Sequence, residues 1–325
     1  MGAHKIILDK PGIYDISEEL YHRDPCLAPS ASSSILRVIA TRTPRHAWYA
    51  HPRLNPAHRA IERGDFDIGK AAHALLLEGE DRMAIVEAGD WRTKEAKAAR
   101  DSARARGKLP LLRKDYDAVK EMVAAAWFQI GAHEITPMLV SADGKQLTFG
   151  AAEQTLIWED AGLWCRVRPD SLDQGQQTIY DYKTTAGSAD PDTWSRNHLW
   201  PGFAIQEAWY KRGVRRVLKW PDPQFRFIVQ ETKPPYALSV VELDPAAQDL
   251  ARRMMEGAWN LWRRCMQTDQ WPGYPGRVAH VAAPGFVAYQ HDEREERDRA
   301  LSAGGDDIFK IMNKWQAPLG QEASS

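Results

Sequence analysis

The stretch RPDSLDQGQQTIYDYKTT, residues 168–185, places Asp170, Asp181 and Lys183 within the alternation of apolar and polar residues that indicates β-strands. Asp170 follows a proline at the end of one predicted strand, and Asp181 and Lys183 lie two positions apart on the next. Because side chains two positions apart on a strand project to the same face, Asp181 and Lys183 point the same way. A hairpin between the two strands would bring Asp170 close to Asp181.

Carboxylates and a lysine are depleted in strands, so their presence here calls for a chemical reason. Two neighbouring carboxylates repel each other unless a cation lies between them, and oxygen ligands suit magnesium. A bound divalent ion can activate water and stabilise charge on a phosphoryl oxygen. A lysine beside it can orient or deprotonate the attacking water, or neutralise charge on the phosphorane. The pattern therefore indicates phosphodiester cleavage. A solvated hairpin remains the alternative, because so short a pattern also occurs by chance.

The surrounding sequence predicts one α/β domain with a central mixed β-sheet flanked by helices. Residues 13–30 are expected to form an irregular lead-in, and Ser32 to Ser34 begin a capped helix that ends near Pro44. An antiparallel meander and two later strands are expected at 147–159, 163–172, 177–185, 224–232 and 236–243. Further helices are expected at 66–78, 94–108, 115–130, 203–213 and 245–268.

The domain is expected to span residues 1–290, with a helical part at 1–135 and the sheet core at 136–268. Residues 291–325 are charged and then rich in small residues, and are expected to form a flexible tail.

Composition excludes several classes of protein. The chain of 325 residues has 43% hydrophobic and 27% charged residues and a net charge of −1, values typical of a globular protein. No apolar run approaches the roughly 20 residues that cross a bilayer. The N-terminus lacks a signal-peptide core, so a cytoplasmic protein is expected, with no membrane partner. The three cysteines, Cys26, Cys165 and Cys265, are spaced for neither a disulfide framework nor a zinc or iron–sulfur site.

Two basic segments stand out against this neutral total. Residues 41–60 contain four arginines, three histidines and no acid, and residues 211–219 contain five basic residues and no acid. Local patches of this kind can hold phosphates even on a neutral protein. The alternative is a solvated surface balanced by acids elsewhere.

Four other residues carry chemistry in a suggestive order. His73 lies in the apolar helix GKAAHALLLE, although a lone histidine in such a helix is more often a buried core residue. Gln206 and Tyr210 form an i,i+4 pair on one helical face, and Glu153 lies in the first strand of the meander. Each signal is weak alone, whereas their order and spacing together are specific.

With these residues in place, the chain resembles the PD-(D/E)XK nuclease superfamily. The resemblance is to the RecE-like branch of phage and prophage exodeoxyribonucleases, related to RecB-type nuclease domains and lambda exonuclease, and it runs from about Tyr21 to Thr268. The matching segments are YHRDPCLAPSASSSILRVIATRTPRHAWYAHP, DIGKAAHALLLE, RVRPD, IYDYKTT and QEAWY. The resemblance implies a restriction-endonuclease-like core.

The resemblance also implies a metal site and a catalytic lysine. His73, Asp170 and Asp181 would ligate the metal, together with the backbone carbonyl of Tyr182, and Lys183 would be the catalytic lysine. The implied metal is Mg²⁺, with Mn²⁺ as a substitute. An iron–sulfur cluster is not expected, because the members that carry one use a cysteine quartet.

Further residues are assigned to the same site or to DNA. Gln206 and Tyr210 would support the site or contact DNA, and Glu153 matches an acidic catalytic position. The residues expected to contact DNA are Arg42, Arg45, Ser33, Lys211 and Arg212.

The leading hypothesis is a metal-dependent exonuclease that degrades linear double-stranded DNA from 5′ to 3′ in phage-type recombination. The resemblance implies a single-strand annealing protein as partner, and a ring-shaped homo-oligomer is a further expectation. The alternatives are an endonuclease of the same fold in a defence or restriction system and a non-catalytic DNA-binding protein. Retention of Asp170, Asp181 and Lys183 together argues against the last.

Overall fold

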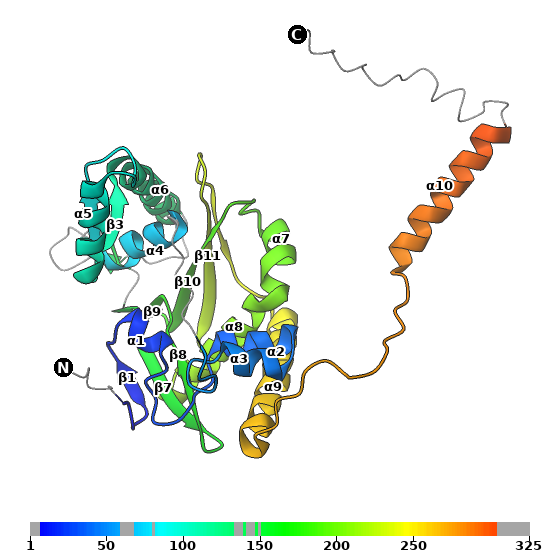
Figure 1. Cartoon of the computed structure of the whole chain (residues 1–325), viewed down its shortest axis with the longest axis horizontal. Helices are drawn as coiled ribbons and strands as arrows, with labels where there is room; N and C mark the ends of the chain where they lie inside the picture. The colour runs from blue at the N-terminus through cyan, green and yellow to red at the C-terminus, as the bar shows by residue number, and fades with distance from the viewer. Residues whose placement is uncertain are drawn as a thin grey trace, which may run out of the picture. The chain divides into compact units, whose positions relative to one another are not determined.

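Residues 171–185 contribute two strands to a five-stranded mixed sheet with the strand order β12-β11-β10-β9-β6. Figure 1 labels β11, β10 and β9 of this sheet. β10 (Thr178–Thr185) runs parallel to β11 (Gln224–Glu231) and antiparallel to β9 (Ser171–Asp173). β12 (Leu238–Val241) and β6 (Ala151–Ala152) form the two edges. The expected central mixed sheet is therefore confirmed.

The computed structural model describes residues 7–58, 68–79, 82–132, 139–140, 147–148 and 151–303. It divides into two compact units, Met1–Tyr274 and Pro275–Ser325. The first unit contains the sheet and its covering helices. In the second, the described helix is α10 (Gly285–Ala303), so the boundary expected at residue 290 lies inside a helix, and the charged sequence after it stays helical to Ala303. Residues 304–325 lie outside the described residues.

Helices cover both faces of the central sheet. One face packs on α2 (Ser33–Thr41), α8 (Ala204–Val217) and α9 (Pro245–Thr268), and the other on α4 (Ile68–Glu78) and α6 (Arg113–Ala132). The alternation of β10 explains this arrangement, because successive side chains enter opposite cores. A parallel strand buried on both faces is typical of an α/β protein.

The expected lead-in at 13–30 is more regular than the sequence indicated. It overlaps β1 (Gly12–Tyr14) and contains α1 (Glu18–His22). β1 pairs antiparallel with β7 (Thr155–Asp160), which pairs with β8 (Leu163–Val167), so these strands form a separate three-stranded sheet. A three-residue strand exists through its pairing with β7 and carries no periodic signal of its own.

Two expected strands are divided. In the segment 147–159, β5 (Leu147–Thr148), β6 and β7 are distinct, and Glu153 lies between β6 and β7 with a φ of 56°. The segment 163–172 bends after β8, and β9 belongs to the other sheet. Glu153 was expected within a strand. Instead it directly follows β6 and has a left-handed backbone conformation. The segment 168–170 joins the two sheets.

The remaining elements lie around this frame. β2 (Met83–Val86) and β3 (Leu109–Leu112) form a parallel pair that was not predicted, joined through α5 (Lys94–Ala105). β4 (Leu139–Val140) pairs with β5. The other helical elements are α3 (Pro44–Ala50), α7 (Pro191–Trp194) and a π-helical segment at Ser195–Phe203. No helix in the described ranges is both long and apolar enough to cross a membrane.

Candidate metal centre

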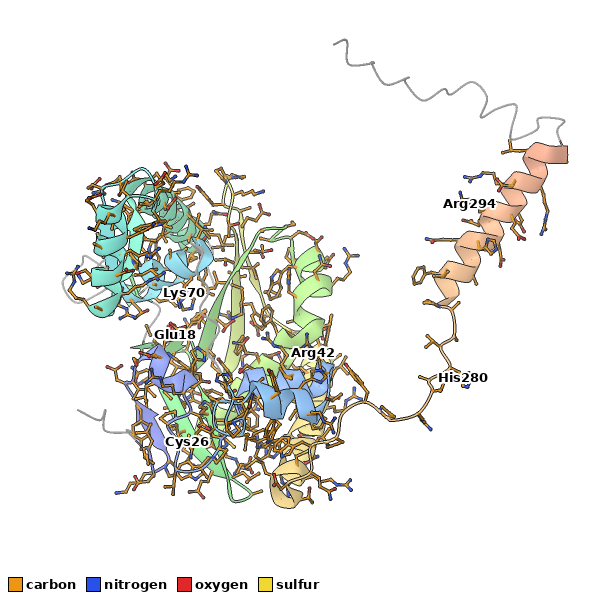
Figure 2. The ribbon with its side chains drawn as sticks, in the orientation of Figure 1. Glu18, Cys26, Arg42, Lys70, His280 and Arg294 are labelled. Carbon is orange, nitrogen blue, oxygen red and sulfur yellow. The ribbon has the colours of Figure 1, made fainter. Side chains whose placement is uncertain are left out.

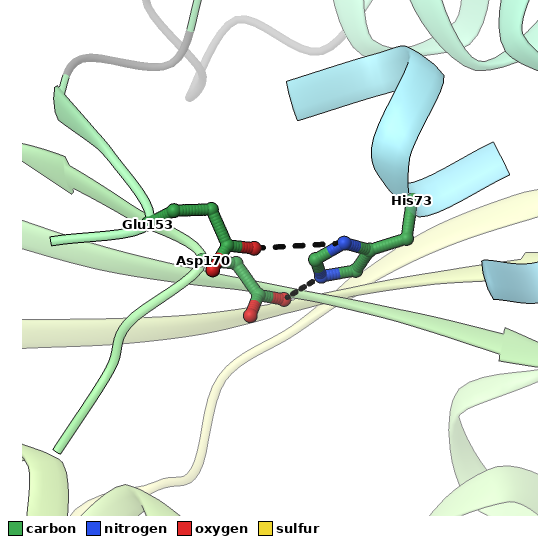
Figure 3. A group of neighbouring side chains, drawn as sticks. All are labelled: His73, Glu153 and Asp170. Atoms are coloured by element: carbon green, nitrogen blue, oxygen red, sulfur yellow. Dashed lines mark ion pairs between the residues drawn. The ribbon is translucent and has the colours of Figure 1, made fainter. Parts of the chain in front are cut away.

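His73 meets two carboxylates at the seam between the two sheets. Its Nε2 lies 3.1 Å from Asp170 Oδ2 and its Nδ1 lies 3.6 Å from Glu153 Oε1 (Figure 3). One ligand atom from each of the three residues lies within 4.8 Å of the others. α4 holds the imidazole here because it packs over β10, where the His73 ring centroid is 6.1 Å from that of Tyr182. These three residues form a group that could hold a metal ion.

Asp170 is fixed by the backbone of the neighbouring strand. Its Oδ2 accepts a hydrogen bond of 2.7 Å from the backbone N–H of Tyr182. Its own carbonyl accepts one of 3.0 Å from the backbone N–H of Glu153. The bend after β8 therefore places Asp170 between the end of β6 and the middle of β10, as the predicted hairpin required.

Glu153 is held by Arg168, a residue that the sequence analysis did not single out. The Arg168 guanidinium donates to Glu153 Oε2, and its Nη1 also donates to the carbonyl of Ile16 at 2.7 Å and to Thr155 Oγ1 at 3.1 Å. A sequence signal existed, because Arg168 is a charged residue two positions before Asp170 in a segment predicted as a strand. Arg168 positions Glu153 toward the imidazole.

Asp181 and Lys183 lie together on one face of β10, as predicted. The Lys183 ammonium forms an ion pair with Asp181 Oδ2, and Gln206 Nε2 donates to Asp181 Oδ1 at 2.7 Å. Asp181 is fully buried, and no donor in the described part of the chain makes a hydrogen bond of normal geometry with its Oδ2. Tyr210 lies one turn beyond Gln206 and donates to the carbonyl of Arg168 at 3.1 Å. The Gln206–Tyr210 pair thus faces the site from α8.

The group predicted to bind metal differs in one member from the group that the structure assembles. His73 and Asp170 were expected with Asp181, whereas the close group contains Glu153 instead, and Asp181 is engaged by Lys183 and Gln206. The backbone N–H of Tyr182 donates to Asp170, and its ring lies near that of His73. The Tyr182 carbonyl remains a predicted ligand.

The charges in this site shift one another strongly. Burial raises the pKa of Asp181 to about 7, against the opposing charge of Lys183. Burial alone would raise the pKa of Asp170, but the neighbouring His73 charge lowers it. For His73, burial opposes the charged form, yet the Asp170 carboxylate outweighs it and raises the pKa to about 9. Burial also raises the pKa of Glu153. Burial alone would lower the pKa of Lys183, but the Asp181 carboxylate raises it, so this lysine is charged.

The residues predicted to contact DNA fall into two sets. Arg42 follows the last residue of α2 and is exposed (Figure 2). Arg45 lies on α3 and is also exposed. Ser33 is the half-buried first residue of α2, whereas the cap is the preceding serine, Ser32.

Lys211 and Arg212 lie elsewhere in the packing. Lys211 is buried, and its Nζ donates to Gln248 Oε1 at 3.0 Å. The Arg212 guanidinium is bound to Asp160 and lies over the ring of Trp259, with 5.9 Å between its carbon and the ring centroid. Both side chains join α8 to its neighbours, so they are left out of the proposed DNA surface.

An ion pair connects α1 to the helix that carries His73. Lys70 Nζ lies 3.6 Å from Glu18 Oε2 (Figure 2). The neighbouring His22, whose Nε2 lies 3.6 Å from Glu18 Oε1, is the main cause that lowers the pKa of Glu18 to about 2, and the charge of Lys70 adds to it. This exposed contact links the lead-in to α4 beside the site.

A protein-family model matches most of the chain. The family model described as “PDDEXK-like domain of unknown function (DUF3799)” matches residues 48–284, a range that contains every residue of the site. Among solved structures, the chain is similar to “Putative exonuclease” from Eubacterium rectale, at 11% identity, with 83% of this chain and 97% of that chain covered and a TM-score of 0.49. The curated proteins contain no match.

Proposed function

Because the chain belongs to the PDDEXK-like family DUF3799, we propose that it is a magnesium-dependent deoxyribonuclease that acts on the ends of linear double-stranded DNA. One observation carries this proposal. The pair of buried Asp181 and half-buried Lys183 lies next to the His73–Glu153–Asp170 group, because Asp170 accepts a hydrogen bond from the backbone N–H of Tyr182, the residue between the pair. A binding protein has no need of this costly concentration of buried and half-buried charge.

The residues present fit a divalent cation. Two carboxylate oxygens and one imidazole nitrogen lie within 4.8 Å of one another, and Asp181 Oδ2 has no hydrogen-bond donor of normal geometry among the described residues. His73, Glu153 and Asp170 would hold the ion, with Asp181 and the Tyr182 carbonyl as further ligands implied by the family resemblance. Oxygen-rich sites of this kind suit magnesium or manganese. The ion would supply Lewis acidity that activates water and stabilises charge on the phosphoryl oxygen.

The chain's own residues orient the attacking water and the carboxylates, and they neutralise the charge that develops on the phosphorane. Lys183 Nζ forms an ion pair with Asp181, a position suited to orient the attacking water and to stabilise the phosphorane charge. Gln206 fixes one oxygen of Asp181, and the Tyr182 N–H fixes one oxygen of Asp170. These contacts preorganise the acids before substrate arrives.

The finer assignment is also part of this proposal. Cleavage from 5′ to 3′, a role in phage-type recombination, a single-strand annealing partner and a ring-shaped homo-oligomer are supported by the resemblance to the RecE-like branch. The exposed Arg42 and Arg45 support capture of a DNA end near α2 and α3. An endonuclease of the same fold would use the same site residues, so the assay must separate the two.

The test uses a linear duplex labelled at one end and a covalently closed circle of the same sequence. The wild type should degrade the linear duplex with Mg²⁺, leave the circle intact and lose activity in EDTA. Lys183→Ala should bind the duplex but not cleave it. Rapid cutting of the closed circle would establish the endonuclease, and cleavage by Lys183→Ala at the wild-type rate would refute the proposed chemistry.

A further inference from the structure

A second cation lies beside the catalytic lysine. Arg37 projects from α2, and its guanidinium carbon lies 5.7 Å from the centroid of the Phe203 ring. Lys183 Nζ lies 5.1 Å from the centroid of the same ring. The separation between the Arg37 guanidinium carbon and Lys183 Nζ is therefore at most the sum of these two distances.

The position of Arg37 is built by its neighbours. A Cβ on Gly202 would lie 2.1 Å from Arg37 Cδ and 2.6 Å from its Cγ, so the arginine side chain passes directly over a backbone that has no side chain of its own. Phe203 is in turn stacked on the buried Trp194, with 5.9 Å between centroids and 12° between planes. The cation–π contact thus rests on a fixed aromatic platform.

Arg37 also lacks the partner that nearby arginines have. Arg166, Arg168 and Arg212 each form an ion pair with a carboxylate. The Arg37 guanidinium has neither an ion pair nor a hydrogen bond with any residue that the structure describes, and its side chain is exposed. A charged group held near another cation without a counter-ion is arranged to receive an anion from outside.

We propose that Arg37 binds a backbone phosphate of the DNA strand at or next to the scissile phosphodiester. Successive phosphates on one strand advance by about 3.4 Å along the helix axis, so a cation this near Lys183 reaches the scissile phosphate or a close neighbour. The planar guanidinium suits a phosphate because it donates two parallel hydrogen bonds. Arg42 and Arg45 continue the exposed basic residues of α2 and α3 and would hold more distant phosphates. This inference rests on the proposed nuclease function.

The test measures binding separately from cleavage. Anisotropy of a labelled duplex is titrated in EDTA with wild type, Arg37→Gln and Arg104→Gln, at several salt concentrations. Arg104 is the matched control, because it is an exposed arginine on α5 with no ion pair among the described residues. Arg37→Gln should weaken binding about tenfold and reduce the salt slope by about one unit, while Arg104→Gln matches the wild type. Equal affinity and slope for Arg37→Gln would overturn the inference.

Two further arms keep the outcomes separate. Gly202→Ala retains the charge but fills the space under Arg37, so it should also weaken binding while keeping the wild-type melting temperature. If Gly202→Ala bound DNA with the wild-type affinity, the inference that Gly202 determines the position of Arg37 would be wrong. In the cleavage assay, a wild type that binds through Arg37 but does not cut would refute the nuclease proposal alone, whereas cleavage with Arg37-independent binding would refute this inference alone. Absence of DNA binding by the wild type would refute both.

Discussion

Replacement of Asp24 by asparagine should disrupt a buried network of ion pairs and hydrogen bonds between the lead-in, residues 13–30, and the three-stranded sheet β1-β7-β8. We call this network the Asp24 brace. Asp24 is 2% exposed, and its carboxylate accepts the backbone N–H of Ser30 at 2.9 Å and the Ser30 hydroxyl at 2.7 Å. Arg166 on β8 lies 3.0 Å from Oδ1, and His51 at the end of α3 lies 3.4 Å from Oδ2. Asparagine keeps the shape and tolerates the left-handed φ of 60° at this position. The variant therefore removes the charge and one of the two acceptor oxygens while keeping the backbone conformation.

The structure sets the size of the effect. Loss of the carboxylate leaves the Arg166 guanidinium buried without a counter-ion, which costs about 3–5 kcal/mol. Although burial alone would raise the pKa of Asp24, the charge of Arg166 and hydrogen bonds from His51 and Ser30 lower it from 3.8 to about 2. A depressed carboxylate pKa stabilises the fold above the unfolded value, and this stability is lost as pH falls toward the folded value. The shift corresponds to about 2 kcal/mol, of which about half is lost by pH 3.

The assay is urea unfolding followed by tryptophan fluorescence at pH 7 and at pH 3. Asp24→Asn should lower the free energy of unfolding at pH 7 and should show a smaller loss than the wild type on acidification. Asp249→Asn is the control, because Asp249 pairs with arginines on the exposed face of α9 and such pairs contribute little. A loss at pH 7 no larger than that of the control, or an unchanged pH dependence, would refute the account of the Asp24 brace.

Three other substitutions test separate parts of the molecule. Burial raises the pKa of Glu207 to about 7, so ionisation of this residue destabilises the wild type as pH rises. Relative to wild type, Glu207→Gln should therefore gain about 3 kcal/mol of unfolding free energy between pH 4.5 and pH 7, measured in urea. A constant difference across this range would contradict the raised pKa. Gln206→Leu should lower kcat on linear duplex about tenfold or more by releasing Asp181 Oδ1, and a wild-type kcat would exclude that role. Arg168→Gln should weaken Mn²⁺ binding about 10- to 100-fold in calorimetric titration by freeing Glu153, and an unchanged Kd would show that Arg168 does not position the ligand.

Where the sequence carried a strong local pattern, it predicted the structure well. The alternation along 177–185 placed Asp181 and Lys183 on one face of β10, and the apolar period of 245–268 gave the bounds of α9. Ser32 was within the predicted cap of α2 and accepts the hydrogen bond from the backbone N–H of Ile35. These features depend on contacts between near neighbours in the chain, which a periodic pattern records directly.

Where an element depends on distant contacts, the sequence predicted less. β1 exists because it pairs with β7, more than a hundred positions away in the chain. Lys211 reads as part of a basic surface, but its ammonium is buried against Gln248 from α9. Spacing along one helix shows which residues share a face, but it does not show what that face meets.

The division of the two strands beside Asp170 shows why the site could be predicted only in part. A sheet change leaves the alternation of side chains nearly intact, so residues 163–172 carried the pattern of one strand while belonging to two sheets. The left-handed Glu153, a conformation that costs about 1–3 kcal/mol for such a residue, ends β6 and lets its N–H reach the Asp170 carbonyl at 3.0 Å. That bond and the Arg168 clamp bring two acids far apart in sequence to the same imidazole. A strained residue that is held by its neighbours and supplies a carboxylate to the centre is better explained by the work of the site than by the stability of the fold, which it lowers.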